Sequence, residues 1–407
     1  MNKPAEGPLA ATSTVDAIRG FHEDLVAIRH DLHAHPELGF EEVRTASVVE
    51  EQLKALGIET HAGIGKTGVV GVLRGTPAPG KPLSSRTIGL RADMDALPIV
   101  ENNAFAYKSS HPHRMHACGH DGHTTMLLGA ARHLATTRNF DGTVHLIFQP
   151  GEEGHAGARA MIEDGLFTRF PCDAVYAMHN WPSLPVGTIG INDGPMMAAA
   201  DRFEITITGR GGHGAHPYLA VDPVVVAGHI ITAVQSIVSR NVSPIDSAVV
   251  TIAAMQAGDM DAFSVIPGTV KLIGTARSFK TTVQLAIEGR LKTLCESIAT
   301  GFGATARCEY HRLYPATINS RDEARFAGDV AESLVGAEHV IRDLPPSMGA
   351  EDFSFMLQQR PGAYLRLGQG GAEQGVFLHN TRYDFNDEVL PIGAGLLAAL
   401  AERAMPR

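Results

Sequence analysis

The sequence predicts an α/β protein with a mixed, mostly parallel sheet covered by helices, into which a smaller ferredoxin-like (βαββαβ) unit is inserted. In the first half of the chain, short apolar runs alternate with helical patterns, as in proteins with a parallel sheet. Near residue 198 the pattern changes to strict alternation, as in "DRFEITITG", which is typical of half-exposed antiparallel strands. A length of 407 residues allows two or three domains.

The elements of the first part follow from periodicity and from cap residues. A helix is expected to start near Ser13 and Thr14, and another covers residues 44–56, where Gly57 ends it. Buried strands are predicted at 67–75, 87–95, 143–150 and 173–179, with helices at 124–135 and 156–165.

The inserted unit shows a different order of elements. Strands are predicted at 201–209, 247–258, 269–279 and 304–313, with helices from Asp222-Pro223 to about Ser239 and over 282–299. This is the order β-α-β-β-α-β of a ferredoxin-like unit. From Tyr314 the α/β pattern resumes and ends in a helix at 390–405. We therefore expect a catalytic domain formed by 1–197 and 314–407 and an inserted domain formed by 198–313.

Composition restricts the class of protein. A hydrophobic content of 44% and a charged content of 19% are typical of soluble globular proteins. The net charge of -10 argues against nucleic acid as a partner, because phosphate binding needs a basic surface. The N-terminal segment lacks the apolar stretch of a signal peptide, and no apolar run of 18 residues predicts a membrane span. The four cysteines are far apart, which favours a reducing, cytoplasmic location without disulfides.

The stretch "MHACGHDGH" (115–123) concentrates metal-ligand side chains in a chain that has 20 histidines. Cys118 and His120 lie two residues apart, so on an extended segment both can point the same way and share a divalent cation. A single histidine in this stretch is more often a packed, hydrogen-bonded side chain than a ligand. The cluster as a whole favours a metal site.

Two pairs of carboxylates follow predicted strands. Asp93 and Asp95, in "RADMDALP", lie at the strand end where open α/β sheets bind ligands, although a solvated turn is the alternative. Glu152 and Glu153 lie between a strand and a helix, so one can bind a metal while the other faces a water. Alone, such a pair is more often an N-terminal complement to the helix dipole.

Two further histidines complete a possible donor set. His179 ends a strand in "AMHNWP", and His379 follows an apolar segment in "VFLHNTRYDFNDE". Each alone is more often structural. Together with Cys118, His120 and Glu153 they give five donors at strand ends or loop entries, which suits one crowded metal or two metals that share a bridge.

The motifs "RADMDALP", "HACGHDGH", "FQPGEEG", "GGHGAHP", "SMGAEDFSF" and "LHNTRYDFNDEVLPIGA" together resemble the M20 metallopeptidase family. More narrowly, they resemble its amidohydrolase branch, which includes hippurate hydrolases, N-acyl-amino-acid deacylases and auxin-conjugate hydrolases. The resemblance extends from about His30 to about Ala394 with the motifs in the same order. It implies a metal-dependent amidohydrolase that cleaves an N-acyl amino acid to a carboxylic acid and a free amino acid.

The resemblance also implies roles for individual residues. The metal ligands would be Cys118, His120, Glu153, His179 and His379, holding two divalent ions per subunit, with Zn²⁺, Mn²⁺, Co²⁺ and Ni²⁺ as candidates. Glu152 would be the general base, and Asp95 would orient the metal site. The ferredoxin-like unit would be a lid that also forms a homodimer or tetramer, and its His213 would reach the partner's active site.

Arg277 matches a lid arginine near the substrate. Ser264 stands in "SVIP", where the family usually has asparagine in "NVIP", which leaves that contact and the exact substrate open. One alternative is an exopeptidase of the same superfamily that cleaves dipeptides. The other is a binding or scaffold protein without catalysis, which is disfavoured because all the key positions are present.

Overall fold

The computed structural model describes residues 14–407, so the N-terminal segment that bears on the signal-peptide prediction lies outside the described residues. The chain divides into two compact units. Among the described residues, the first unit comprises 14–194, Ile318–Pro345 and Phe355–Arg407, and the second comprises Pro195–Thr317 and Pro346–Ser354.

The first unit is built on an eight-stranded sheet with the strand order β1-β2-β4-β3-β5-β16-β6-β15. The strands are β1 (Glu59–Ile64), β2 (Gly68–Arg74), β3 (Thr87–Asp93), β4 (Thr143–Gln149), β5 (Ala174–Trp181), β6 (Ile189–Gly190), β15 (Val340–Ile341) and β16 (Gly362–Gly368). The central strands β4, β3, β5 and β16 run parallel, whereas β1, β2 and β4 pair antiparallel. The prediction of a mixed, mostly parallel sheet is therefore confirmed.

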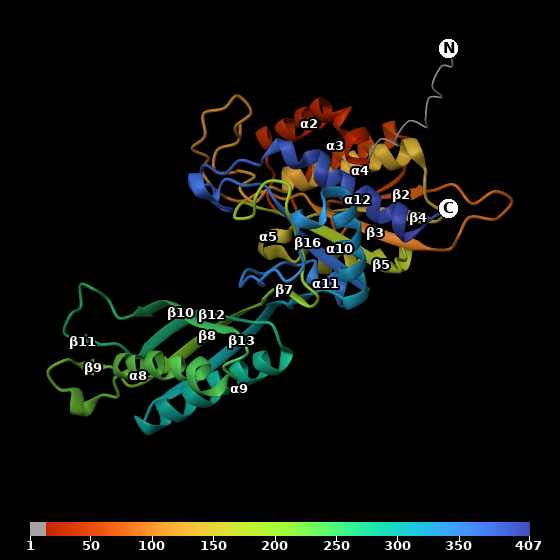
Figure 1. Cartoon of the computed structure of the whole chain (residues 1–407). Coiled ribbons are helices and arrows are strands. Elements are labelled where there is room, and N and C mark those ends of the chain that lie inside the picture. Colours follow the sequence, from red (N-terminus) through yellow and green to blue (C-terminus); the bar gives the residue numbers. More distant parts are fainter. Residues whose placement is uncertain (1–13) are drawn as a thin grey trace, which may run out of the picture. The chain divides into compact units, whose positions relative to one another are not determined.

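Helices cover this sheet, and their apolar faces build its core. They are α1 (Thr14–Arg19), α2 (His22–Ala34), α3 (Val43–Ala55), α4 (His120–Thr137), α5 (Glu152–His155), α6 (Gly157–Glu163), α7 (Leu166–Arg169), α10 (Arg321–Val335), α11 (Ser354–Leu357) and α12 (Leu390–Ala404). Figure 1 shows α2, α3, α4 and α12 gathered on one side of the sheet. Their buried side chains join those of β2, β3 and β4 in one hydrophobic cluster.

Some helix boundaries differ from the sequence prediction. The first predicted helix is interrupted after Arg19, and α2 follows as a separate helix from His22. Helix α4 begins at His120, four residues earlier than predicted, because Gly119 adopts a left-handed conformation (φ 100°) that ends the preceding loop. Sequence periodicity had not singled out α10, although its apolar residues lie on one face.

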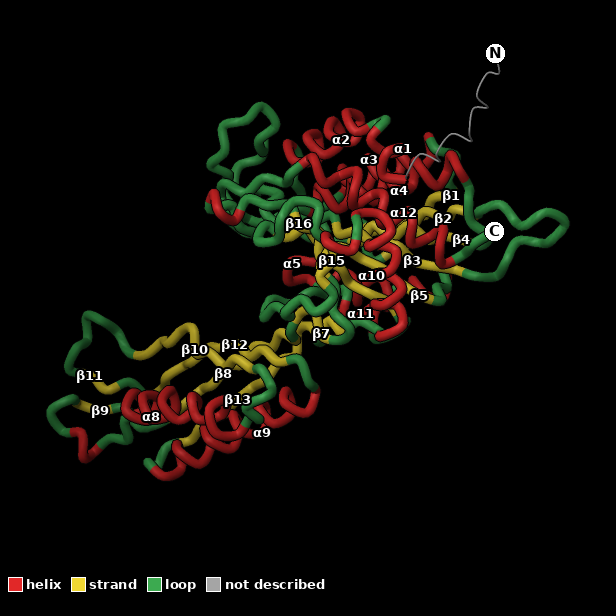
Figure 2. Tube along the Cα trace, in the orientation of Figure 1, coloured by secondary structure: helices red, strands yellow, loops and turns green. Residues whose placement is uncertain are grey.

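The second unit contains a four-stranded antiparallel sheet with the order β10-β12-β8-β13. Its elements are β7 (Pro195–Met197), β8 (Ala199–Thr208), β9 (Gly212–His213), α8 (Pro223–Ser236), β10 (Ala248–Ala257), β11 (Val265–Ile266), β12 (Thr269–Ser278), α9 (Thr281–Gly301), β13 (Thr305–Tyr314) and β14 (Thr317–Ile318). Figure 2 shows α8 and α9 side by side along this sheet, and their buried residues share a core with it.

Among the described residues, one helical segment, Pro223–Asn241, is long and apolar enough to cross a membrane by length and composition alone. The sequence predicts no membrane-spanning run. One third of its most apolar window (33%) is buried. Val226, Ile230 and Val234 pack into the core of the second unit, as the apolar face of a core helix does, so the segment is weak support for a membrane span.

We expect the core of the first unit to depend on the centre of β3. Leu90 on β3 is fully buried, so Leu90→Ala should lower the free energy of unfolding by about 2–5 kcal/mol through lost burial and a cavity. Urea unfolding followed by circular dichroism measures the change. Val43→Ala is the control, because Val43 is 65% exposed and its truncation should cost less than about 0.5 kcal/mol. Equal effects of the two substitutions would contradict this description of the core.

Candidate metal centre

The carboxyl ends of three neighbouring strands place the candidate side chains. Strand β3 runs parallel to both β4 and β5, so the ends of these strands lie at one edge of the sheet. Asp93 is the last residue of β3, and His179 lies two residues before the end of β5. Gln149 ends β4 and leads directly into the turn that carries Glu152 and Glu153.

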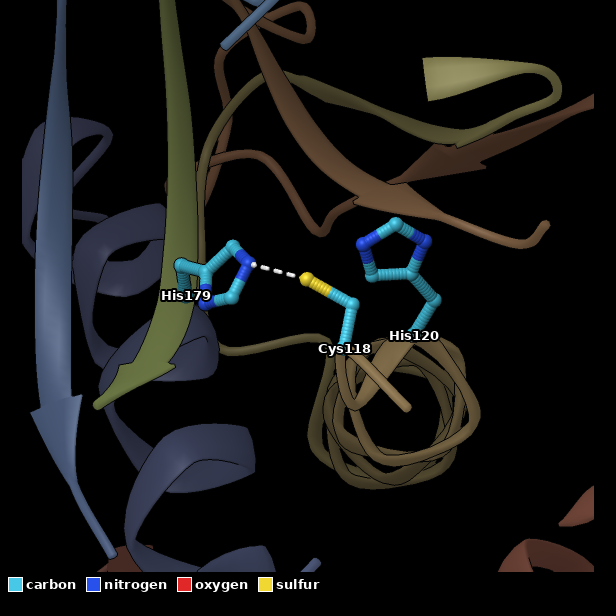
Figure 3. Close-up of side chains that lie close together, drawn as sticks. All are labelled: Cys118, His120 and His179. Atoms are coloured by element: carbon cyan, nitrogen blue, oxygen red, sulfur yellow. Dashed lines mark hydrogen bonds between the residues drawn. The ribbon is translucent and has the colours of Figure 1, made fainter. Parts of the chain in front are cut away.

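Cys118, His120 and His179 meet at this edge. Cys118 Sγ lies 3.3 Å from His179 Nε2. One potential ligand atom from each of the three residues lies within 4.8 Å of the other two. Figure 3 shows the thiol and the His120 ring rising from the start of α4 while the His179 ring points toward them from β5. The turn needs Gly119, because a Cβ atom there would lie 2.4 Å from Asn180 Oδ1.

In both His120 and His179, the ring nitrogen Nδ1 donates a hydrogen bond to a backbone carbonyl oxygen. His120 Nδ1 donates to the Asp95 carbonyl oxygen at 2.9 Å and lies 3.2 Å from Asp95 Oδ1. His179 Nδ1 donates to the Asn180 carbonyl oxygen at 2.7 Å. His120 Nε2 is buried and has no hydrogen-bond partner among the described residues. Metal-ligating histidines are oriented in this way, with one nitrogen bound to an acceptor and the other directed at the ion.

Glu152, Glu153 and His379 extend the cluster. His379 Nε2 lies 3.1 Å from Glu153 Oε1, and the Glu153 backbone N–H donates to Asp95 Oδ2 at 2.9 Å. Cys118, Glu153 and His379 form a second group of potential ligands, and His120, Glu152 and Glu153 form a third. All five predicted donors, together with the predicted base Glu152, therefore lie in overlapping groups.

His379 reaches this cluster through a rare backbone conformation. Its φ is 62°, in the left-handed region that residues other than glycine seldom adopt. A hydrogen bond from the His379 backbone N–H to the Ala117 carbonyl oxygen, 2.7 Å long, fixes it beside the segment that carries Cys118. Conformations of this kind are found most often at functional sites.

The electrostatics of the site suit a divalent cation. Burial, followed by the nearby His123, holds the pKa of His179 well below its usual value, so the imidazole is in the neutral form that binds metals. Burial, followed by Glu153 and Glu152, raises the pKa of the Cys118 thiol, so an adjacent cation is needed to form a thiolate. Burial opposes the charge of His120, but Asp93 and Asp95 outweigh it and raise its pKa to about 10. A bound cation would supply the positive charge that these carboxylates favour.

The structure adds a buried network to the predicted residues. His123 Nδ1 lies 2.5 Å from Asp93 Oδ1, and its Nε2 lies 2.7 Å from Asn180 Oδ1. Burial opposes ionisation of Asp93, but His120, Arg91 and His123 hold its pKa well below the usual value. The sequence motifs include Asp93 and His123 but predict no specific role for either. The positions of Asp93 at a strand end and of His123 in the stretch rich in metal-ligand side chains are the sequence features that point to this network.

Glu42 was missed entirely, and it holds the turn before Glu152. The Gly151 backbone N–H donates to Glu42 Oε1 at 2.8 Å, and the Thr67 hydroxyl donates to Glu42 Oε2 at 2.6 Å. Glu42 is fully buried, and burial, with a contribution from Asp95, raises its pKa to about 7. Its partner Gly151 lies 109 residues away, so no local pattern reveals the contact.

The remaining predicted residues belong to the second unit. His213 is exposed on β9 and pairs with Val265 on β11. Ser264 lies next to it, because the Gly214 backbone N–H donates to the Ser264 carbonyl oxygen at 2.7 Å. Arg277 is half-buried on β12, where its guanidinium donates to Thr275 Oγ1 and to the backbone. The second unit therefore brings His213 and Ser264 together.

The raised pKa of Glu42 predicts a pH dependence of stability. A carboxyl whose pKa rises from 4.5 in the unfolded chain to about 7 in the folded chain binds its proton more tightly when folded. Stability should therefore fall as pH rises from 4.5 to 7, by at most about 3.4 kcal/mol at 1.36 kcal/mol per pKa unit. Urea unfolding of chelator-treated protein across this range should show a shallower decline for Glu42→Gln. Identical pH profiles for the two proteins would refute the assignment.

Comparison with known proteins gives the same family as the motifs. Residues 89–403 match the family Peptidase family M20/M25/M40. Hippurate hydrolase of Campylobacter jejuni is 44% identical over 92% of this chain and 94% of its own length. N-acetylcysteine deacetylase of Bacillus subtilis is 38% identical over 95% of this chain and 98% of its own length.

A solved structure agrees with these sequence matches. The Bacillus subtilis YXEP protein, a dinuclear metal-binding peptidase from the M20 family, superposes with a TM-score of 0.82 at 35% identity. The match covers 95% of this chain and 99% of that protein. The predicted class of enzyme, a hydrolase of amide bonds, is the class of these proteins, and the chain belongs to the M20/M25/M40 peptidase family.

Proposed function

We propose that this chain is a metal-dependent amidohydrolase that cleaves hippurate-like N-acyl amino acids to a carboxylic acid and a free amino acid. The observation that carries the proposal is the overlap of three ligand groups, which together contain Cys118, His120, Glu153, His179, His379 and Glu152. Relatives with 44% and 38% identity are a hippurate hydrolase and an N-acetylcysteine deacetylase, both named for N-acyl amino acids.

The five donors would hold one or two divalent ions per subunit, and two ions agree with the dinuclear relative. A thiolate with imidazole and carboxylate donors suits Zn²⁺ and also accepts Mn²⁺, Co²⁺ or Ni²⁺. Bound divalent ions would polarise the amide carbonyl and favour ionisation of a water. Asp95 keeps the ligands in place, because its carboxylate lies 3.2 Å from His120 Nδ1 and accepts the Glu153 backbone N–H at 2.9 Å.

Glu152 would move the proton. Its carboxylate is buried and belongs to the same group as His120 and Glu153. In that position it can take a proton from the attacking water and return it to the nitrogen of the leaving amine. The turn that presents Glu152 is anchored by the bond from Gly151 to Glu42, which limits the movement of the base.

The second unit would act as a lid and as the dimerisation domain, with 198–313 as the inserted domain and 1–197 and 314–407 as the catalytic domain. Its four strands and two helices follow the order β8-α8-β10-β12-α9-β13, which supports a ferredoxin-like fold. In a homodimer or tetramer, the exposed His213 would stabilise the developing oxyanion in the partner's active site. Arg277 and Ser264 would contact the substrate.

A second candidate is an exopeptidase that cleaves dipeptides. It is favoured by the peptidase with 35% identity and a TM-score of 0.82, whose match covers nearly the whole chain. Both candidates share the metal site and the base and differ in the pocket that holds the substrate. Ser264 bears on this choice, because a hydroxyl is shorter than the carboxamide usual at this position and offers different hydrogen bonds.

Two substitutions test the predicted general base and one predicted metal ligand independently. Glu152→Gln should lower turnover about 10²–10⁴-fold, the range for loss of general acid–base catalysis, while elemental analysis still finds metal. Cys118→Ser should lower the bound metal itself, because a hydroxyl is a poor substitute for a thiolate. Normal turnover by Glu152→Gln would exclude Glu152 as the base. Unchanged metal content in Cys118→Ser would exclude the thiol as a ligand.

A substrate panel tests the function directly. Chelator-treated protein should be inactive, and Zn²⁺, Mn²⁺, Co²⁺ or Ni²⁺ added with a reductant should restore activity. The restored enzyme is then compared on N-benzoylglycine, N-acetyl amino acids and dipeptides by kcat/KM. We expect the N-acyl amino acids to be preferred. A preference for dipeptides would favour the exopeptidase, and metal-independent hydrolysis would contradict both candidates.

A further inference from the structure

Two cysteines of the second unit lie together, far in sequence from the metal ligand Cys118. Cys295 is on α9 and Cys308 is on β13, and both are free thiols. Cys295 is fully buried, while Cys308 is partly exposed at the edge of the same hydrophobic cluster. Neither thiol has a role in the proposed hydrolysis.

The local fold explains why these thiols meet. Cys295 lies six residues before Gly301, the last residue of α9, which is about 9 Å along a helix. Cys308 lies three residues after Thr305, the first residue of β13, which is about 10 Å along a strand. Because β13 runs back along α9 after a short turn, the two residues reach the same depth. Both residues contact the same hydrophobic cluster, and each thiol shifts the pKa of the other, so the two side chains lie close together.

The periodicities of both elements direct these side chains inward. Ile287, Leu291, Cys295 and Ala299 recur every four residues along the buried face of α9. On β13 the partly buried residues Ala306, Cys308 and Tyr310 alternate with exposed ones and pack against the same cluster. The contact between the thiols therefore follows from the packing of two regular elements.

The surroundings make Cys308 the more reactive thiol. The interaction with the Cys295 side chain is the main cause that lowers the pKa of Cys308; burial opposes it, and the Lys292 ammonium assists. The same contact, together with burial, raises the pKa of Cys295. A partly exposed thiol with a lowered pKa beside a second thiol is typical of cysteines that react with peroxides.

We propose that Cys295 and Cys308 are a redox modification site, at which a small hydroperoxide such as hydrogen peroxide converts the two thiols into a disulfide. The Cys308 thiolate attacks one peroxide oxygen, the O–O bond breaks, and the leaving hydroxide is protonated to water. Cys308 is thereby oxidised to the sulfenic acid. Cys295 sulfur then attacks the Cys308 sulfur, the S–O bond breaks, and hydroxide leaves as water with the Cys295 proton. The resulting bond would join α9 to β13.

The test uses the full-length, metal-loaded chain. The protein is treated with hydrogen peroxide, free thiols are blocked with iodoacetamide, and peptides are mapped by mass spectrometry with and without a reductant. We expect the peptides that carry Cys295 and Cys308 to be joined, to have lost two hydrogen atoms, and to separate when the reductant is added. Separate, alkylated Cys295 and Cys308 peptides under conditions that oxidise Cys118 would overturn the proposal.

Two variants serve as controls. Cys308→Ser should lose the linked peptide and leave Cys295 alkylated, since the attacking thiolate is gone. Cys172→Ser is the matched control, because Cys172 is also buried but its sulfur lies 3.5 Å from His145 Nδ1 and from the Phe170 carbonyl oxygen. This variant should still form the link. Accumulation of Cys308 sulfinic acid in the wild-type protein without a link would also count against the proposal, because it would show that Cys295 does not resolve the intermediate.

Discussion

The candidate site depends on two buried carboxylates, Asp93 and Asp95, at the end of strand β3. Asp95 binds His120 and the Glu153 backbone, and Asp93 binds His123, so one strand end fixes groups from helix α4 and from the turn after β4. A buried carboxylate is costly unless it is paired, and here each is paired with an imidazole. The same negative charge that orients the histidines favours a cation between them. The order of the site and the affinity expected for a cation therefore have a common electrostatic origin.

Backbone conformation is the second requirement. Gly119 adopts a φ of 100° immediately before α4, and His379 has a φ of 62°. Both conformations bring a candidate ligand side chain to a place that a regular helix or strand does not reach. The cost of such conformations is of the order of 1–3 kcal/mol for a residue other than glycine, and the surrounding hydrogen bonds must offset it. For His379, the bond to the Ala117 carbonyl oxygen is one of these.

The two units differ in how their sheets are packed against helices. In the first unit, a parallel sheet buried by helices such as α4 and α12 gives polar loops a rigid edge on which to converge. In the second unit, an antiparallel sheet packs α8 and α9 on one core and leaves polar residues of β8 and β12 outside it. This second core also holds the thiol pair of α9 and β13. The thiol pair and the cluster of candidate metal ligands thus belong to separate units of the chain.

Sequence alone predicted the mixed, mostly parallel sheet and most of the candidate donors. Alternation of apolar runs predicted the parallel sheet, and the unusual density of ligand side chains in "MHACGHDGH" identified Cys118 and His120, because such patterns are local. Only the tertiary structure decided which residues distant in sequence support the site. Glu42 binds Gly151 across 109 residues, and Asn180 binds His123 across 57, contacts set by strand order rather than by neighbours in sequence. The left-handed backbone of His379 was equally hidden, because no local sequence pattern specifies it, whereas the hydrogen bond to the Ala117 carbonyl oxygen holds it in the folded chain.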